Sequence, residues 1–473
     1  MSAKNPAPGP QPERFAAYLN RLAHAAGHAD RATPLQAYCA ALLLPGERKS
    51  VEPMAARLAP DNVRRTHQSL HHLVAAAPWS DEAVLREARA YVLAAMRQKG
   101  PVRAWIVEDI GFVKKGTHSV GVARQYGGQV GKQENCQVAV SLSSSTPTAS
   151  LPVAWRLYLP EVWARDRTRR KQAGVPEDIS FQTKPEIALQ QIRTAVEEGL
   201  PPAPVWADAA YGTDPQFREA ITELGLPYGV GIMSSVTVWK PGEGPRGKPQ
   251  WKGRGRPPQF LQRGQQQQPV SVKELAVSLP APAWKKVSWR QGTKHNRTSR
   301  FAAVRIRAAH RDSERSEPHP PEWLLIEWPR EQAEPTQYWL STVPEDEKLS
   351  ALVRLAKHRW IIERDYQELQ QELGLGHFEG RGWRGFHHHA TLCIAAYGFR
   401  VSERSRFSPS ARTGRLDLRV PTIPPDFQPR GSPRAGPAAS SALHRNPAHP
   451  DYPLPSPATP RLPFLLRVTP ITQ

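Results

Sequence analysis

The sequence predicts a mixed α/β protein in which an N-terminal helical segment precedes a sheet that a later helix completes. Three observations lead to this prediction. A helical pattern of apolar residues fills residues 14–98, short apolar runs rich in β-branched residues follow from residue 102, and helical periodicity returns near residue 358. Strands and helices that alternate in this way favour a mixed sheet with helices packed on its faces.

The N-terminal part contains five amphipathic segments within residues 14–100, after a Pro-rich start at residues 1–13 that we expect to be disordered. Ser80 precedes two acidic residues and predicts the N-cap of the last segment. Basic side chains lie around the third and fourth segments (Arg48, Lys49, Arg57, Arg64 and Arg65). A small helical domain with a basic edge is typical of DNA-binding modules. A solvated face of a helical bundle explains the same pattern.

The first part of the sheet is predicted within residues 101–233. The run RAWIVEDIGF contains Asp109, and THSVGVARQY and NCQVAVSLS predict two further strands around the turn GGQVGK. The strand WRLYLP follows. Thr183 and Glu186 have the spacing of a capping box and predict the start of a helix. The apolar run PVWADAAYG then ends a strand at Asp208, as the first run ends at Asp109.

Residues 345–400 carry the second part of the core. Their central stretch, HRWIIERDYQELQQELGLGHF, predicts an amphipathic helix that ends before Gly374. Arg359, Glu363 and Gln370 fall on roughly one face of this helix. A carboxylate on such a face can point into a site, although a surface Arg–Glu pair explains the spacing equally well.

Asp109, Asp208 and Glu363 together suggest a metal site. An acidic residue at the carboxyl end of a strand lies where ligands bind to open α/β sheets. Hard divalent cations take oxygen ligands, and two such ions about 3.5–4 Å apart can clamp a phosphodiester. The interval between Asp208 and Glu363 is too long for a simple connection, so we expect an inserted element between them.

This insertion is predicted at residues 234–344. It begins with a basic low-complexity tract and continues with β-prone runs such as KKVSWRQGT, FAAVRIRAAH, PEWLLIEWP and TQYWLSTV. In the tract, Arg254 and Arg256 form an Arg-Gly-Arg-Pro sequence that resembles the core of an AT-hook, where arginines enter a narrow minor groove. A solvated loop that attracts phosphate loosely is the alternative.

The formal net charge of +21 favours a polyanionic partner, with nucleic acid as the first candidate and an acidic membrane surface as the second. No apolar run is long enough to span a bilayer, and the start of the chain lacks the apolar segment of a signal peptide, so we expect a cytoplasmic protein. Cys39, Cys136 and Cys393 lie far apart and are expected to be buried thiols.

Two further segments carry predictions of their own. Three consecutive histidines, His387–His389, point in different directions on a helix and are not expected to bind one ion. Residues 401–473 are rich in proline and arginine, which predicts a disordered basic extension.

Three long stretches resemble a known family: IVEDIGFVKKGTHSVGVARQYGGQVGKQENCQVAV, VWADAAYG and HRWIIERDYQELQQELGLGHFEGRGWRGFHHHATLCIAAYGF. They are similar to bacterial insertion-sequence transposases of the DDE superfamily, specifically insertion-sequence family 701, a relative of insertion-sequence family 4. The stretches GERKSVEPMAARL and QSLHHLVAAAPWSDE share the likeness, which covers about residues 14–410.

The resemblance implies a ribonuclease-H-like catalytic core with a β-rich insertion, and cut-and-paste chemistry on the terminal inverted repeats of the element. It places the first Asp of the triad at Asp109, the second at Asp208 and the Glu at Glu363. A related Tyr-Arg-Glu-Lys signature matches at Arg359 and Glu363. It departs at Ala356, which stands in the Tyr position, and at Gln370, which stands in the Lys position.

The resulting hypothesis is a metal-dependent endonuclease and strand transferase. Asp109, Asp208 and Glu363 hold two Mg²⁺ ions, which Mn²⁺ can replace, and Arg359 orients Glu363 or contacts the cleaved strand. Lys114 and Lys115 hold the DNA backbone, unless they are ordinary turn lysines. Double-stranded DNA, from the transposon ends and the target, is the expected partner of a homodimer associated with the nucleoid. The rivals are an inactive DNA-binding remnant or repressor, and a nuclease that joins nothing.

Overall fold

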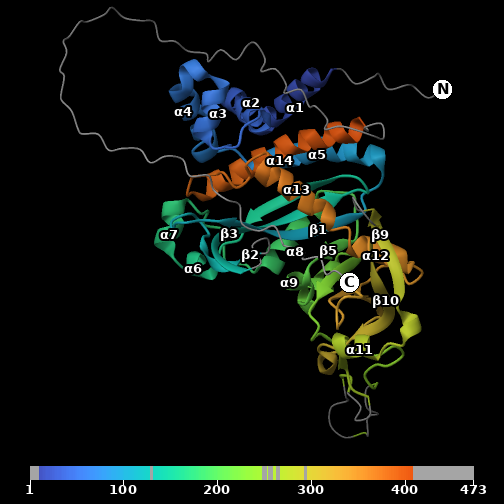
Figure 1. Ribbon diagram of the computed structural model, residues 1–473. Helices are drawn as coiled ribbons and strands as arrows, with labels where there is room; N and C mark the ends of the chain where they lie inside the picture. Colours follow the sequence, from blue (N-terminus) through green and yellow to red (C-terminus); the bar gives the residue numbers. More distant parts are fainter. Residues whose placement is uncertain are drawn as a thin grey trace, which may run out of the picture. The chain divides into compact units, whose positions relative to one another are not determined.

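Figure 1 shows the computed structural model of the chain, which describes residues 10–127, 132–247, 253, 259–262, 267–291 and 296–407. The N-terminal part forms the predicted helices, each within a few residues of its expected position. They are α1 (Gln11–Ala25), α2 (Ala29–Leu43), α3 (Val51–Leu58), α4 (Val63–Ala75) and α5 (Asp81–Met96). The Ser80 side chain accepts a hydrogen bond from the Ala83 amide at 3.1 Å, which confirms the predicted N-cap of α5.

A single mixed sheet of twelve strands is the centre of the described residues. Its strands are β1 (Ala104–Val113), β2 (Ala123–Gly127), β3 (Lys132–Ser145), β4 (Ser150–Leu157), β5 (Val205–Ala207), β6 (Tyr228–Ile232), β7 (Thr237–Trp239), β8 (Val270–Ser271), β9 (Lys285–Gln291), β10 (Asn296–Ala308), β11 (Glu322–Trp328) and β12 (Gln337–Ser341). The strand order is β2-β3-β1-β5-β6-β12-β11-β10-β7-β8, with β4 on β3 and β9 on β10. The sequence prediction of a mixed α/β fold is therefore confirmed.

Strand direction divides this sheet into two parts. Strand β3 runs antiparallel to β1 and β4, whereas β5 is parallel to both β1 and β6. The carboxyl ends of β1, β5 and β6 consequently lie at the same edge of the sheet. From β6 onward, through β12, β11 and β10, every pairing is antiparallel.

Helices cover both faces of the first part of the sheet. In the view of Figure 1, α5, α13 (Trp360–Gln371) and α14 (Trp383–Arg406) lie above the sheet, and α8 (Lys184–Glu197) and α9 (Ala209–Gly212) lie below it. The capping box predicted at Thr183 and Glu186 opens α8. The remaining helices are α6 (Glu161–Ala164), α7 (Arg167–Ala173), α10 (Pro215–Glu223), α11 (Val272–Ser278) and α12 (Leu349–Ala356), with short 3₁₀ turns at Pro60–Asn62, Arg97–Lys99, Ala281–Ala283 and Asp312–Glu314.

Helix α14 is buried along most of its length and joins the N-terminal helices to the sheet. The three consecutive histidines on it contact three different places, as predicted. His387 Nε2 accepts from the Leu157 amide at 3.2 Å on β4, and His388 bonds the carbonyls of Val74 and Trp79 at 3.0 Å. His389 Nδ1 lies 2.8 Å from the Tyr38 hydroxyl on α2. These side chains therefore join α14 to β4, to the end of α4 and the residues before α5, and to α2.

The predicted insertion is continuous with the core sheet. Its last strand, β12, pairs with β6 from Tyr338–Ile232 to Ser341–Gly229, so backbone hydrogen bonds join the two segments directly. We expected a β-rich subdomain behind a basic loop, and its β-strands are observed. Sequence periodicity identified β9 to β12 but not their neighbour in the sheet, because pairing between distant strands leaves no local pattern.

Both ends of the described chain extend further than predicted. Helix α1 begins at Gln11, inside the segment expected to be disordered, and α14 continues to Arg406, past the predicted boundary at residue 400. Burial explains the second difference, because Val401 and Glu403 pack in the interior and Glu403 accepts two hydrogen bonds from Arg14. Composition alone does not show that Arg-rich residues are the last turns of a buried helix.

Cys39, Cys136 and Cys393 are free and buried, as predicted. Among the described helices, none has a stretch that is long and apolar enough to cross a bilayer.

Asp365 is a buried acid on α13, and burial raises its pKa from the ordinary 3.8 to about 7, against hydrogen bonds from Ser150 and Tyr397 that lower it. A raised carboxyl pKa means that the folded state binds the proton more tightly than the unfolded state. Stability from this residue is therefore present below pH 4 and falls as pH rises towards 7, by up to roughly 4 kcal/mol.

We expect Asp365→Asn to remove this dependence. The difference in unfolding free energy between wild type and variant, measured by urea denaturation from pH 5 to pH 8, should shift in favour of the variant as pH rises. Parallel stability curves for the two proteins across that range would contradict the assignment.

Candidate active site

Asp109 is buried within β1, and the prediction that it ends this strand is wrong, because the pairing with β3 continues to Val113. Its Oδ2 forms an ion pair of 2.6 Å with Lys184 Nζ, at the first turn of α8. Its Oδ1 accepts a hydrogen bond from the Tyr211 hydroxyl on α9. Burial and then the charge of Asp109 raise the pKa of Tyr211 well above its ordinary value, so the phenol stays protonated and donates.

Asp208 follows β5 directly and caps α9, where its Oδ1 accepts from the Ala210 amide at 2.9 Å. Parallel pairing places Trp105 beside Val205 and Ile106 beside Trp206. Continued by two residues, this register puts Asp208 beside Glu108. Half-exposed Asp208 thus lies next to the acidic pair of β1, with Oδ2 at 3.8 Å from Arg359 Nη2.

Glu108 is the main partner of Arg359. The guanidinium donates from Nε to Oε2 and from Nη2 to Oε1, both at 2.6 Å, in a two-pronged ion pair. Burial raises the pKa of Glu108, and Arg359 opposes this shift. The pKa of Arg359 is itself raised, because Glu108, followed by Asp208 and Glu363, outweighs the effect of burial. The sequence prediction linked Arg359 to Glu363 or to DNA and did not identify Glu108.

Glu363 is exposed in the first turn of α13, one turn after Arg359. Tyr366, about one turn further along this helix, fixes it to the sheet through a hydrogen bond of 2.5 Å between its hydroxyl and Ser141. Ser141 is paired with Glu108 across β1 and β3, so α13 covers the face of the sheet to which Glu108 points.

Neighbouring residues of a strand point to opposite faces, and this separates the two acids of β1. Glu108 faces α13, with Arg359 and Glu363, whereas Asp109 faces α8 and contacts Lys184. Among the described residues, one group of His, Cys, Asp or Glu side chains has three ligand atoms within 4.8 Å of one another, namely Glu219, His310 and His319. The predicted triad does not meet this criterion. The predicted carboxylates therefore surround one edge of the sheet without forming a closed cluster.

The residues predicted to bind DNA have different positions. Lys114 Nζ donates to the Phe378 carbonyl at 3.1 Å, and burial lowers the pKa of this lysine. Lys115 is exposed beside it, and Gln370 is half-buried on α13. Arg254 and Arg256 lie outside the residues that the structure describes.

Three residues of the site were missed by sequence reasoning, although two of them lie in motifs that drew attention. Tyr211 belongs to the DAAYG motif, and Lys184 follows the Thr183 cap of α8. Glu108 is the direct neighbour of Asp109 in the run RAWIVEDIGF. Each of these residues can be read in the sequence, but the side chain that it contacts lies on a different helix or strand.

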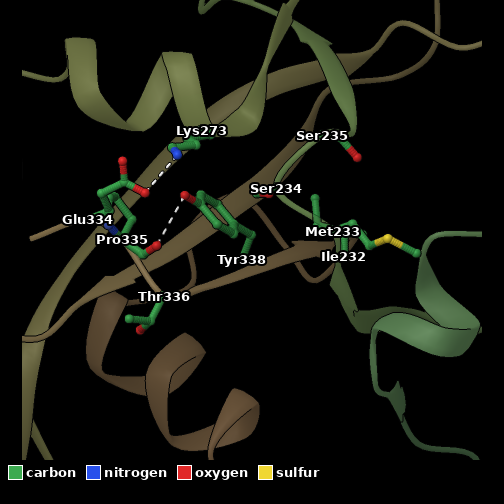
Figure 2. Close-up of a pocket in the computed structure, with 9 residues that line it drawn as sticks. All are labelled: Ile232, Met233, Ser234, Ser235, Lys273, Glu334, Pro335, Thr336 and Tyr338. Atoms are coloured by element: carbon green, nitrogen blue, oxygen red, sulfur yellow. Dashed lines mark hydrogen bonds and ion pairs between the residues drawn. The ribbon is translucent and has the colours of Figure 1, made fainter. Parts of the chain in front are cut away.

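A pocket of about 390 Å³ lies elsewhere, between the end of β6, α11 and the start of β12. Figure 2 shows the residues that line it. An ion pair of 2.7 Å between Lys273 and Glu334 lies beside it, and the Tyr338 hydroxyl donates to the Pro335 carbonyl at 3.4 Å. Of the predicted site residues that the structure describes, none lines this pocket.

Comparison with known proteins gives evidence about the family of the chain that is independent of this geometry. Residues 16–296 match the family described as DDE superfamily endonuclease. The chain belongs to the DDE superfamily of endonucleases. The matched segment of this DDE superfamily member contains Asp109 and Asp208 and ends before Glu363. A probable transposase for insertion sequence element IS701 from Microchaete diplosiphon is 32% identical over 193 residues. That similarity spans 41% of this chain and 46% of the relative.

Proposed function

We propose that the protein is a DNA transposase that cleaves the ends of an insertion sequence and joins them to a target in a cut-and-paste reaction. The observation that supports this proposal is that Asp109, Asp208, Arg359 and Glu363 surround one edge of the sheet in a member of the DDE endonucleases. The similarity to a probable IS701 transposase supports transposition rather than DNA degradation alone.

A ribonuclease-H-like core is part of this proposal, and strand order supports it. Strands β4-β3-β1-β5-β6 form a three-stranded antiparallel meander followed by two strands parallel to β1. Asp109 lies within β1, the first of these core strands along the chain, and Asp208 directly follows β5, the fourth. We also propose that residues 14–100 are a DNA-binding domain and that residues 234–344 are an insertion between the two parts of the core, residues 101–233 and 345–400.

The donor set fits two divalent ions of the Mg²⁺ or Mn²⁺ class. All three proposed ligands, Asp109, Asp208 and Glu363, offer hard carboxylate oxygens, and cationic side chains already balance the negative charge around them. Lys184 stands where a cation would bind Asp109, and an ammonium group is a point charge that a divalent ion can displace. When bound, the ions supply Lewis-acid activation of a water or DNA 3′-hydroxyl and stabilise the departing oxygen.

The protein side chains prepare this chemistry. Tyr211 orients the Asp109 carboxylate by donating to Oδ1, and the cap of α9 fixes one oxygen of Asp208. Arg359 occupies both oxygens of Glu108, which leaves Asp109 as the β1 carboxylate that exchanges its partner. The exposed Glu363 is the ligand that reaches the site from α13, beside the scissile DNA strand.

Double-stranded DNA is the proposed partner, and the net charge of +21 supports an electrostatic contribution to binding. Two protomers on a pair of transposon ends and a location at the bacterial nucleoid complete the proposal.

The test is an assay with purified full-length protein, Mg²⁺ and labelled DNA that carries the element's terminal inverted repeats and a supercoiled target plasmid. We expect cleavage at the repeat ends and covalent insertion products flanked by short target duplications. Cleavage without insertion would support a nuclease that joins nothing. Binding without nicking in Mg²⁺ or Mn²⁺ would support an inactive remnant, which Ala356 and Gln370 make the specific alternative.

A further inference from the structure

A second cluster of ligand-type side chains lies away from the acidic edge, where the β10–β11 loop meets α10. The loop contributes His310 and His319, and α10 contributes Glu219. One ligand atom from each of these side chains lies within 4.8 Å of the other two. His319 is buried, and the side chains of His310 and Glu219 are 20% and 38% exposed, so the cluster is accessible from solvent on one side.

We propose that Glu219, His310 and His319 bind one Zn²⁺ ion that fastens the β10–β11 loop of the insertion to α10 of the core. Two imidazoles and a carboxylate are a recognised donor set for zinc, with a water in the fourth tetrahedral position. In such a site, zinc–ligand bonds of 2.0–2.1 Å separate neighbouring ligand atoms by about 3.3 Å. The cluster therefore has to contract by no more than about 1.5 Å, which side-chain rotation can supply.

Hydrogen bonds prepare the two histidines for this role. His319 Nε2 lies 2.9 Å from the backbone carbonyl of His310, which can only accept, so Nε2 carries the proton and Nδ1 has the free lone pair. A metal-binding histidine typically donates its second nitrogen to a carbonyl in this way. His310 Nε2 lies 3.2 Å from Glu219 Oε1, and both atoms can bind one zinc ion when the imidazole proton is on Nδ1, because Nε2 then has the lone pair.

Charged groups of both signs lie next to the cluster. Arg315 Nη1 lies 3.6 Å from Glu219 Oε1, and Asp312, whose Oδ2 accepts from Trp239 Nε1 at 3.1 Å, offsets this positive charge from within the loop.

The location gives the ion a mechanical consequence for the acidic edge. Arg218, next to Glu219, is buried and donates to the Gly212 carbonyl at the end of α9, the helix that Asp208 caps. A zinc ion at Glu219 would hold α10 against the insertion loop and so stiffen the support of α9. The proposed site does not depend on the chemistry at Asp109.

The experiment measures zinc binding by the untagged full-length protein after removal of metal with a chelator. We expect one equivalent of Zn²⁺ by elemental analysis, a rise in melting temperature with Zn²⁺, and visible absorption of four-coordinate cobalt when Co²⁺ replaces it. Glu219→Gln, which preserves shape at a partly exposed position, should weaken binding by at least about 100-fold, as loss of a ligand exceeds loss of an outer hydrogen bond. His319→Gln should do the same.

His67 and His71 provide a matched control, because these histidines stack one helical turn apart on α4 without belonging to the cluster. The double variant His67→Gln/His71→Gln should bind zinc like the wild type. Absence of a stoichiometric ion in the wild type, unchanged binding in Glu219→Gln, or loss of binding in the α4 variant would each overturn the proposal. A melting temperature of metal-free Glu219→Gln equal to that of the metal-free wild type shows that the variant is folded.

Discussion

Replacement of Asp109, Asp208 or Glu363 by alanine should abolish Mg²⁺-dependent cleavage of transposon ends while DNA binding is largely retained. Each change removes a proposed metal ligand, and we expect a rate loss of at least about 1000-fold, or roughly 4 kcal/mol of transition-state stabilisation. Single-turnover cleavage of labelled repeat DNA measures the first effect, and gel-shift titration measures the second. Cleavage retained by any one variant would remove that residue from the site.

Conservative substitutions of the two neighbouring acids of β1 distinguish which of them is the metal ligand. Asp109→Asn and Glu108→Gln each remove one charge without changing shape, on opposite faces of the same strand. If Asp109 is the ligand, Asp109→Asn should lose cleavage, and Glu108→Gln, which affects only the partner of Arg359, should reduce cleavage much less. The reverse result would assign the metal to Glu108, on the side of α13. Glu197→Gln, at an exposed position of α8, is the control for a general loss of negative charge.

Arg359→Ala should destabilise the fold by about 2–3 kcal/mol, because it leaves the carboxylate of Glu108 buried without its partner. The Glu108 side chain is only 13% exposed, whereas that of Arg359 is 37% exposed, which reduces the expected loss below that of a fully buried pair. The variant should also lose cleavage, since Arg359 lies beside Asp208. Urea denaturation and single-turnover kinetics measure the two effects separately.

A double-mutant cycle isolates the ion pair. Arg359→Ala in the Glu108→Gln background should cost much less stability than in the wild type, with a coupling energy of about 2 kcal/mol. Additive losses would show that the two side chains act independently. Arg354→Ala, on the exposed face of α12, should leave stability and cleavage nearly unchanged.

Local patterns predicted much of the fold. Periodicity located α1 to α5, and the caps at Ser80 and Thr183 are present because each hydroxyl satisfies an amide of the first turn of its own helix. What the sequence did not contain was the pairing of β12 with β6. Hydrogen bonds between strands of distant sequence depend on the whole sheet and not on the residues of either strand alone.

The candidate site shows the same limit. Asp208 was recognisable as an acid at the end of a strand, whereas Asp109 lies inside β1, which continues to Val113. Which of the neighbouring carboxylates Glu108 and Asp109 points towards a given helix depends on the face of β1 that the helix covers. Lys184 was visible only as a residue of a capped helix turn, and its contact with Asp109 joins elements 75 residues apart. Long-range partners of this kind determine charge and orientation in the site.

The attachment of β12 to β6 has a consequence for attempts to simplify the protein. A chain from which residues 234–344 were excised would lose its β12 and expose the backbone amides and carbonyls along β6 to solvent. Exposed edge strands of this kind pair with other chains, so the shortened protein would self-associate instead of working as a smaller nuclease. The segment that looks dispensable in the linear sequence thereby covers β6, which would otherwise be an edge strand of the core.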